Sequence, residues 1–358
     1  MPMKEVRLGV VGAGQISHVA CEEIARHPDA RVVAAADLHE ARLGELCEKF
    51  GVERRYLDPE ALFADPEVDG VYIATPNVYH APLALAALQQ GKHVILEKPF
   101  AMNAAEAEAV IACAAEHRRV FTVGMNQRFR EDSQKVRELV RRGDLGTVYH
   151  SKAFWLRRAG IPKLGTWFGK KALSGGGSLL DIGVHLLDLA LFVADRFDPV
   201  SVCGQTYSEF GPRGLGEGGW GYSDRSETGF DVEDFATALI KFRSGATLTL
   251  DVSWALHQRD GNRMNVLVHG SEAGAGLYPG ELYRFGKPEE DYQVIGDLDV
   301  AVPFPHESRF HNFVNALLGR EALCVSPEQA LCVQRILDAI YESTRSGKEV
   351  QLQARTTS

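Results

Sequence analysis

The first third of the chain alternates short apolar runs with amphipathic stretches of helical period. Strand-length apolar runs that alternate with helices predict a doubly wound parallel sheet. In such a sheet, ligands bind beyond the carboxyl ends of the strands. The expected strands are 6–11, 31–36, 68–74, 93–96 and 120–123. The first expected helix follows a glycine turn and ends at residue 27, and the other helices are expected over 39–50, 80–90 and 103–117.

After residue 125 the apolar positions change to a period of two, which predicts a largely antiparallel sheet. A helix near 174–188 separates the first two of these strands, and helices at 306–318 and 327–345 close the chain. We therefore expect an α/β domain over 1–125. An α+β domain with a large, mainly antiparallel open sheet should follow over 126–358, and its closing helices could pack back on the first domain. The expected strands of the second sheet are 147–157, 200–208, 233–242, 246–255, 263–269 and 281–285.

A glycine turn, Gly12-Ala-Gly14-Gln15-Ile16, joins the first predicted strand to the first helix. Gly12 permits the tight turn, and Gly14 lets backbone amides at the helix N-terminus approach a pyrophosphate, with Gln15 and Ile16 beside it. Asp37 ends the second strand, where its carboxylate would accept hydrogen bonds from a ribose diol. Asp37 also repels a 2′-phosphate, and the two residues after it offer no arginine to bind one. The expected cofactor is therefore NAD rather than NADP.

Polar residues follow the third and fourth predicted strands, at the edge where a cofactor would bind. Thr75, Asn77 and His80 come after the third strand, and Glu97 and Lys98 come after the fourth. We expect all five to contact the cofactor. Lys98 is also a catalytic candidate, because a buried strand end locked by a following proline is a poor place for a solvated charge. The alternative is that Lys98 caps the strand or pairs with Glu97.

The stretch from Ser174 to Asp188 contains three glycines and then an apolar helical run, in which His185 follows Asp181 by four residues. This spacing puts both side chains on one face of a helix, which Asp188 should share. A carboxylate can fix the tautomer and orientation of an imidazole, so His185 is a candidate general base. Gly183 lowers helix stability by about 1 kcal/mol relative to Ala, which predicts a bulky neighbour close to the backbone. The alternative is a buried histidine satisfied by a helical neighbour.

Three motifs that lie far apart in the sequence are together similar to those of the Gfo/Idh/MocA family, the relatives of glucose–fructose oxidoreductase and inositol dehydrogenase. The motifs are Gly12-x-Gly14, Glu97-Lys98-Pro99 and Asp181-x-Gly183-x-His185. The resemblance covers nearly the whole chain, and Ser17, at the usual third Gly/Ala of the glycine fingerprint, is its main departure. It implies a Rossmann domain followed by an open, mainly antiparallel sheet domain. It also implies oxidation or reduction of a hydroxyl or carbonyl group on sugars, cyclitols and related compounds with NAD(P). Lys98, Asp181 and His185 match the family's catalytic residues.

The resemblance implies a dehydrogenase that acts on a secondary alcohol or ketone of a sugar, cyclitol or related polyol. His185 would remove the hydroxyl proton, Asp181 would orient it or hold a neighbouring hydroxyl, and Lys98 would stabilise the developing alkoxide. Lys98 could instead be the base, because buried lysines can lose their proton. Substrate contacts are expected from Lys98, Asn126, Arg158, Trp167, Asp181 and His185. For the cations and rings near 155–171, the simpler explanation is a solvated face or a core position.

Two other functions remain open. One is a cofactor-binding sensor without turnover, against which the presence of all three catalytic residue types argues. The other is an enzyme that holds NAD tightly and recycles it within one turnover, with net hydrolase or epimerase-like chemistry. Accumulation of NADH in solution would separate that enzyme from an ordinary dehydrogenase.

Composition excludes several classes of protein. The chain has 358 residues and a formal net charge of −9, without the basic excess expected of a nucleic-acid binder. The six cysteines form no Cys-x-x-Cys pair, so we expect no metal site and reduced thiols in a cytoplasmic protein. We expect that no apolar run approaches the ~20 residues of a membrane span, and the N-terminus does not resemble a secretory signal.

The second domain is expected to have an open sheet face and a long glycine-rich loop. One face of its sheet, with residues such as Leu248, Leu250 and Val252 or their neighbours, should be covered by another subunit in a homodimer or homotetramer. Residues 209–230 contain seven glycines and should form a long loop that borders a pocket or a subunit contact.

Overall fold

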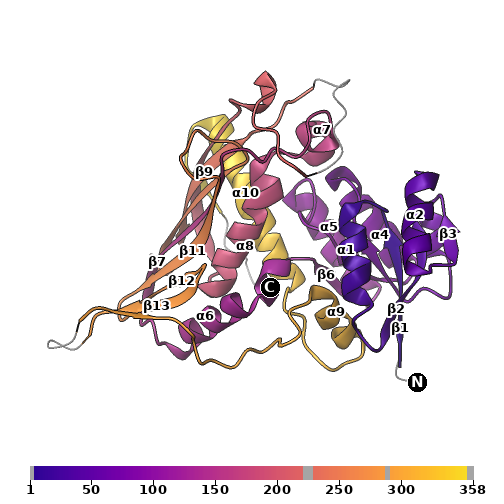
Figure 1. Ribbon diagram of the computed structural model, residues 1–358, viewed down its shortest axis with the longest axis horizontal. Coiled ribbons are helices and arrows are strands. Elements are labelled where there is room, and N and C mark those ends of the chain that lie inside the picture. Colours follow the sequence, from indigo (N-terminus) through magenta and orange to yellow (C-terminus); the bar gives the residue numbers. More distant parts are fainter. Residues whose placement is uncertain (1–3, 221–228, 287–290, 353–358) are drawn as a thin grey trace. The chain divides into compact units, whose positions relative to one another are not determined.

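The computed structural model describes residues 4–220, 229–286 and 291–352, and the chain forms two compact units (Figure 1). The first unit contains residues 1–126 and 306–331, and the second contains residues 127–305 and 332–358. Each unit has its own sheet. The expected fold class, a parallel α/β domain with a second domain of mainly antiparallel sheet, is confirmed.

The first unit is built on a six-stranded parallel sheet with the strand order β3-β2-β1-β4-β5-β6. The order reverses beside β1, so the carboxyl ends of β1 and β4 flank the switch point where ligands bind in doubly wound sheets. The strands are β1 (Val6–Val11), β2 (Ala30–Ala36), β3 (Arg54–Tyr56), β4 (Gly70–Ile73), β5 (His93–Leu96) and β6 (Phe121–Val123). The helices are α1 (Gln15–Ile24), α2 (Glu40–Phe50), α3 (Pro59–Phe63), α4 (His80–Gln89), α5 (Ala104–Glu116) and α9 (Arg309–Leu317).

Helix α9 comes late in the chain but belongs to the first unit. Its Phe310 and Phe313 are fully buried in the same apolar cluster as Val6 and Leu8 of β1. The Phe310 ring also meets the Tyr72 ring edge-on, with 5.0 Å between centroids. Burial of each phenylalanine contributes about 1.5–3 kcal/mol, which explains why this late segment folds with the N-terminal sheet.

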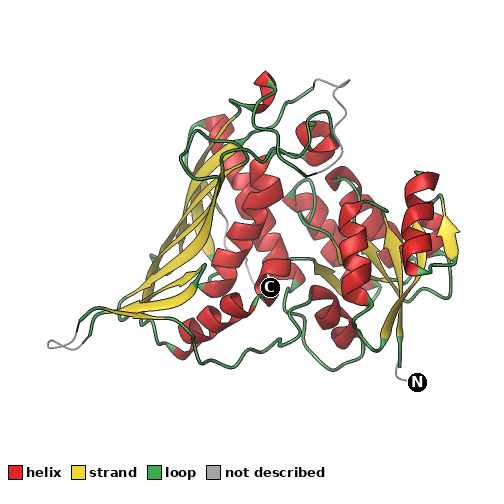
Figure 2. Cartoon of the chain, in the orientation of Figure 1, coloured by secondary structure: helices red, strands yellow, loops and turns green. Residues whose placement is uncertain are grey.

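The second unit is built on a nine-stranded sheet with the order β14-β13-β12-β11-β7-β10-β9-β8-β15. Neighbouring strands are antiparallel except β7 and β10, which run parallel. Helices α6 and α8 pack on one face of this sheet (Figures 1 and 2). The strands are β7 (Val148–Arg157), β8 (Pro199–Tyr207), β9 (Phe235–Phe242), β10 (Thr247–Ser253), β11 (Asn262–Gly270), β12 (Gly274–Leu277), β13 (Gly280–Arg284), β14 (Gln293–Ile295) and β15 (Val350–Gln351). The helices are α6 (Glu131–Arg142), α7 (Lys171–Ser174), α8 (Val184–Val193) and α10 (Pro327–Ser346), the last of which begins in the first unit.

Of the two faces of β10 that the prediction left open for a subunit contact, the face with Leu248, Leu250 and Val252 is covered within the unit. Leu248, Leu250 and Val252 are buried within the unit, and a Cβ at Gly183 would lie 3.1 Å from Val252 Cγ2. Their side chains therefore pack toward the helical segment that contains Gly183. The opposite face carries their neighbours Thr247, Thr249 and Asp251.

Within the part of the chain that the structure describes, one segment meets the length and composition of a membrane span, so the expectation that no run approaches this is wrong. Residues 171–193 have a mean hydropathy of 1.6 over their most apolar window. In the fold, 89% of that window is buried. An apolar helix inside a soluble core gives the same sequence signal, because it is hydrophobic on all sides.

Candidate active site

The glycine turn after β1 leaves the N-terminus of α1 open. Gly12 has φ +94°, and a Cβ there would collide with the carbonyl of Ala74, so only glycine fits. Gly14 is the N-cap residue of α1, where no side chain caps the helix and an added Cβ would meet nothing within 4 Å. The unpaired amides of the first helical turn, which includes Gln15 and Ile16, therefore fit a pyrophosphate.

Ser17 and Asp37 hold this turn in place. The Ser17 hydroxyl is buried and donates to the Gly12 carbonyl, which explains a serine at the departure from the glycine fingerprint. The Asp37 carboxylate accepts hydrogen bonds from Ala13 N at 2.6 Å and His39 N at 2.7 Å. Each carboxylate oxygen keeps a further lone pair, which a ribose diol could use. Leu38 beside it is 81% exposed and carries no charge.

The polar residues after β4 and β5 divide into two kinds. His80 is buried, with ring nitrogens 2.7 Å from the Pro99 carbonyl oxygen and 3.0 Å from the Thr75 carbonyl oxygen. Burial lowers its pKa, so the neutral imidazole joins the two loops. Thr75 instead has a buried Oγ1 without a hydrogen-bond partner among the described residues, which suits a ligand contact. Asn77 is buried and Lys98 is half-buried.

Glu97 lies in an internal network that the sequence did not reveal. Its carboxylate accepts from the Tyr72 hydroxyl at 2.5 Å and from Lys98 N at 3.0 Å, and it pairs with Arg309 at 2.6 Å. Burial would raise the pKa of Glu97, but Arg309 and Tyr72 hold it below its ordinary value. This network fixes the backbone on the N-terminal side of Lys98. Only the fold brings Arg309 of α9 to this site.

In the second unit, Asp181 and His185 lie where a π-helical turn (Leu179–Gly183) passes into α8. Both side chains are half-buried. The Asp181 carboxylate accepts a hydrogen bond of 2.8 Å from the indole of Trp254, and the His185 ring lies 6.5 Å from the Trp155 ring, centroid to centroid. π-Helical turns occur often at functional sites. The bulky neighbour expected at Gly183 is β10, which packs against the backbone there.

A buried carboxylate holds the N-terminal end of this helical segment. Glu233 accepts hydrogen bonds of 2.9 Å from Gly177 N and Leu179 N and one of 3.0 Å from the Tyr341 hydroxyl. A Cβ at Gly177 would collide with the Glu233 carbonyl, and one at Gly176 would collide with the Tyr341 hydroxyl. The glycines before the helix are therefore required by residues distant in sequence. Burial raises the pKa of Glu233, although the hydrogen bonds act against this.

Asp188 has a different role from Asp181. It is fully buried and forms a two-point ion pair with Arg128, with Nε–Oδ2 at 2.9 Å and Nη2–Oδ1 at 2.5 Å. Asp188 was expected on the helix face of the catalytic pair, and in the fold its carboxylate neutralises Arg128. Its ion pair instead joins α8 to the 3₁₀ turn at Asn126–Phe129.

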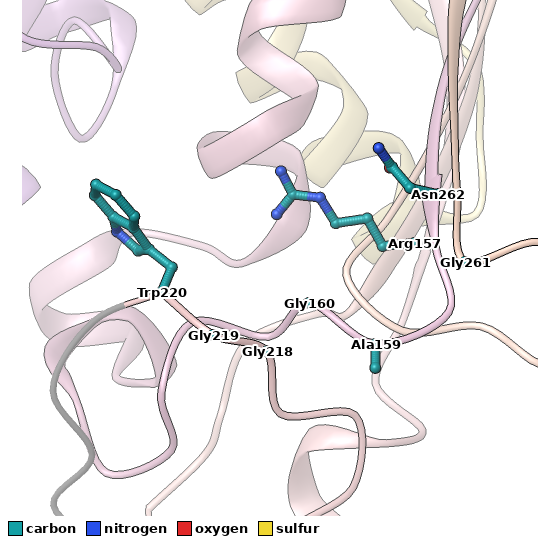
Figure 3. A pocket seen from close by; sticks show the side chains of 8 residues that line it. All are labelled: Arg157, Ala159, Gly160, Gly218, Gly219, Trp220, Gly261 and Asn262. Atoms are coloured by element: carbon teal, nitrogen blue, oxygen red, sulfur yellow. The ribbon is translucent and has the colours of Figure 1, made fainter.

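A cavity of about 240 Å³ opens at the end of β7 (Figure 3). Of the two neighbouring arginines there, Arg157 lines the cavity, whereas Arg158 is exposed and donates to the Arg259 carbonyl. Strand β7 ends at Arg157, and Arg158 lies in the bend that follows. Trp167 stacks on Phe168 with 3.9 Å between centroids, and Asn126 is exposed in the first unit. Substrate contacts by Arg158, Trp167 and Asn126 stay predictions.

The Gly-rich loop expected over 209–230 borders this cavity, through Gly218, Gly219 and Trp220. Residues 221–228 of that loop lie outside the described residues. Among the described residues, no group of three or more His, Cys, Asp or Glu side chains could hold a metal ion.

Comparison with known proteins gives matches along most of the chain. Residues 6–125 match the oxidoreductase family model with an NAD-binding Rossmann fold, and residues 133–275 match the GFO/IDH/MocA C-terminal domain. D-glucoside 3-dehydrogenase of Escherichia coli (strain K12) is 32% identical over 354 residues, which cover 98% of this chain and 99% of the relative. Myo-inositol 2-dehydrogenase of Thermotoga maritima is 30% identical over 249 residues, 69% of this chain and 68% of the relative. The crystal structure of GenD2 from gentamicin A biosynthesis in complex with NAD superposes with a TM-score of 0.80 at 26% identity, covering 99% of this chain and 98% of that one.

Proposed function

Because the chain belongs to the GFO/IDH/MocA family of oxidoreductases, we propose that it moves a hydride between NAD and a secondary alcohol or ketone of a sugar, cyclitol or related polyol. The observation that carries this proposal is the pairing of Asp181 with Trp254 on the helical turn that presents His185. The relatives named as glucoside and inositol dehydrogenases support the substrate class.

The first unit would bind the cofactor, which supplies the hydride acceptor when bound. The amides at the start of α1 would hold the pyrophosphate, and Asp37 would accept hydrogen bonds from the adenosine ribose. Asp37 is already fixed by two backbone amides, so its charge stays where a 2′-phosphate would have to lie. This favours NAD over NADP. Thr75 and Asn77 would contact the same molecule.

The proton of the substrate hydroxyl would go to His185. Asp181, oriented by the Trp254 indole, would hold the imidazole or a neighbouring hydroxyl group. Lys98, from the first unit, would donate a hydrogen bond to the reacting oxygen and stabilise its developing negative charge. The alternative division, with Lys98 as base, uses the same three residues.

The test is a screen of glucosides, inositols and their ketones with NAD and NADP, read by the absorbance of the reduced nicotinamide. We expect reduction of NAD by at least one sugar or cyclitol. His185→Asn should lower the rate by about 10²–10⁴-fold, whereas His150→Asn, a matched histidine that stacks on His269 in the sheet, should not. The absence of nicotinamide reduction with every substrate would contradict the proposal. Product formation without accumulated NADH would instead indicate an enzyme that recycles NAD.

A further inference from the structure

The cavity at the end of β7 is suited to one substituent of a ligand. Its volume of about 240 Å³ is smaller than the ~300–1,000 Å³ of pockets that enclose whole small molecules. Arg157 and Asn262 reach it from neighbouring strands, and Trp220 lines it from the loop (Figure 3). None of the described residues that line it is acidic, and Arg157 gives this part of the lining one positive charge.

Closely packed backbone forms one wall of this cavity. Gly160 N and Ile161 N donate to the Gly216 carbonyl, and Gly218 N donates to the Ile161 carbonyl, each at 2.8–2.9 Å. A Cβ at Gly218 would lie 2.8 Å from Gly160 Cα, and one at Gly160 would lie 2.5 Å from Arg157 Cδ. Glycines at both positions thus let the two segments pair beside the arginine.

The Arg157 guanidinium has unused hydrogen-bonding capacity. It lies 4.4 Å from the Trp155 ring centroid, which orients it, and it is half-buried. Among the described residues, no carboxylate lies within 4 Å of it and no hydrogen bond from its side chain is formed. A guanidinium has five N–H donors, and in this open cavity the oxygen atoms of water or of a ligand can accept from them. Burial lowers the pKa of Arg157, while the charge of Asp181 acts in the opposite direction.

The cavity adjoins the catalytic pair. Trp155, which carries Arg157 over its ring, also lies beside the His185 ring and donates a 2.9 Å hydrogen bond to Asn262 Oδ1. Asp181 is near enough to influence the ionisation of Arg157. A substrate whose hydroxyl group meets His185 could therefore extend a substituent toward Arg157.

Building on the proposed function, we propose that this cavity is a subsite for a carboxylate on the substrate, bound by Arg157. Hydroxyl groups of a neutral polyol could also bind here, but the one formal charge among the described lining residues is the positive charge of Arg157. A carboxylate only accepts, and its two oxygens match the fork of a guanidinium. The carboxylate could belong to the sugar ring, as in a uronic acid, or to the group attached through a glycosidic bond.

The experiment compares kcat/KM for two matched pairs of substrates. Methyl glucoside against methyl glucuronide tests a carboxylate on the ring, and hydroxyethyl glucoside against carboxymethyl glucoside tests one on the attached group. In at least one pair, the kcat/KM of the wild-type protein should be about 10- to 100-fold higher for the acid, because a hydrogen bond to a charged group stabilises binding by about this factor. Arg157→Gln should remove that preference and leave the neutral partner within about 3-fold, and Arg157→Lys should restore part of it.

Arg263→Gln is the matched control, because Arg263 lies near the same end of the sheet with its guanidinium over Phe154 instead. It should keep the preference. Direct binding of the acids, followed by tryptophan fluorescence, separates this inference from the proposed function: binding that requires Arg157 supports the subsite even if no nicotinamide is reduced. Equal kcat/KM within both pairs, or equal losses for acid and neutral partner in Arg157→Gln, would overturn it and leave Arg157 as a counter-charge for Asp181.

Discussion

Replacement of Asp188 by Asn should destabilise the second unit strongly without touching the substrate. Asp188 and Arg128 are 1% and 0% exposed, and two hydrogen bonds join them. The guanidinium also lies 4.9 Å from the Phe192 ring centroid and 5.3 Å from that of Phe197, so apolar groups surround the charge. Asn fills the same volume but leaves the buried cation without its anion.

Removing one partner of a buried ion pair lowers the free energy of unfolding by about 3–5 kcal/mol. For a unit of about 200 residues, each kcal/mol shifts Tm by about 2–4 °C, so the expected fall in Tm is about 6–20 °C. Urea unfolding followed by circular dichroism, together with a thermal scan, measures both quantities. Because α8 also presents His185, kcat should fall with stability.

Two variants make the reasoning refutable. Asp195→Asn removes the carboxylate of a more exposed pair, Arg137–Asp195 at 3.2 Å, and should change stability by no more than about 1 kcal/mol. Arg128→Met combined with Asp188→Leu replaces both buried charges with apolar groups and should recover most of the loss. If Asp188→Asn lowers the free energy of unfolding as little as Asp195→Asn does, the reasoning is refuted. It is also refuted if the double variant is no more stable than Asp188→Asn.

Further predictions concern cofactor preference, the identity of the proton acceptor, the pH dependence of stability, and the oligomeric state. Asp37→Ser with Leu38→Arg should shift steady-state preference toward NADP, and a wild type equally efficient with both cofactors would contradict the role of Asp37. His185→Ala should lower kcat by about 10²–10⁴-fold. The acid limb of the pH profile should vanish in His185→Asn but persist in Lys98→Met, and the reverse would make Lys98 the base. Because the pKa of Glu233 is raised, the folded state binds this proton more tightly than the unfolded chain. Stability should therefore fall as pH rises from about 4.3 through the raised value, and Glu233→Gln should flatten this slope in thermal scans. Light scattering at micromolar concentration should give a dimer or tetramer, and a monomer would contradict the predicted contact through the open sheet face.

The local pattern of residues in the sequence was sufficient to predict the architecture and part of the cofactor site. Apolar runs that alternate with helices specify a parallel sheet, and a period of two specifies the second sheet, because side-chain direction follows directly from residue spacing. The glycine turn and Asp37 could be placed side by side because both follow neighbouring strands. The expected β10 segment was found, but a period of two does not say which face the helices cover, so the sequence left both Leu248 and its neighbours as candidates for the open face.

Tertiary structure decided what each polar residue does. Asp181 and Asp188 are the same residue type in one helical segment, yet one accepts from Trp254 and the other neutralises Arg128. Glu233 gave no sequence signal, although it holds the start of that segment. The same limit applies to Arg157, which only the pairing of two distant loops places beside a cavity. Spacing along the chain determines which way a side chain points, whereas its partner, burial and ionisation depend on residues brought to it from far along the sequence.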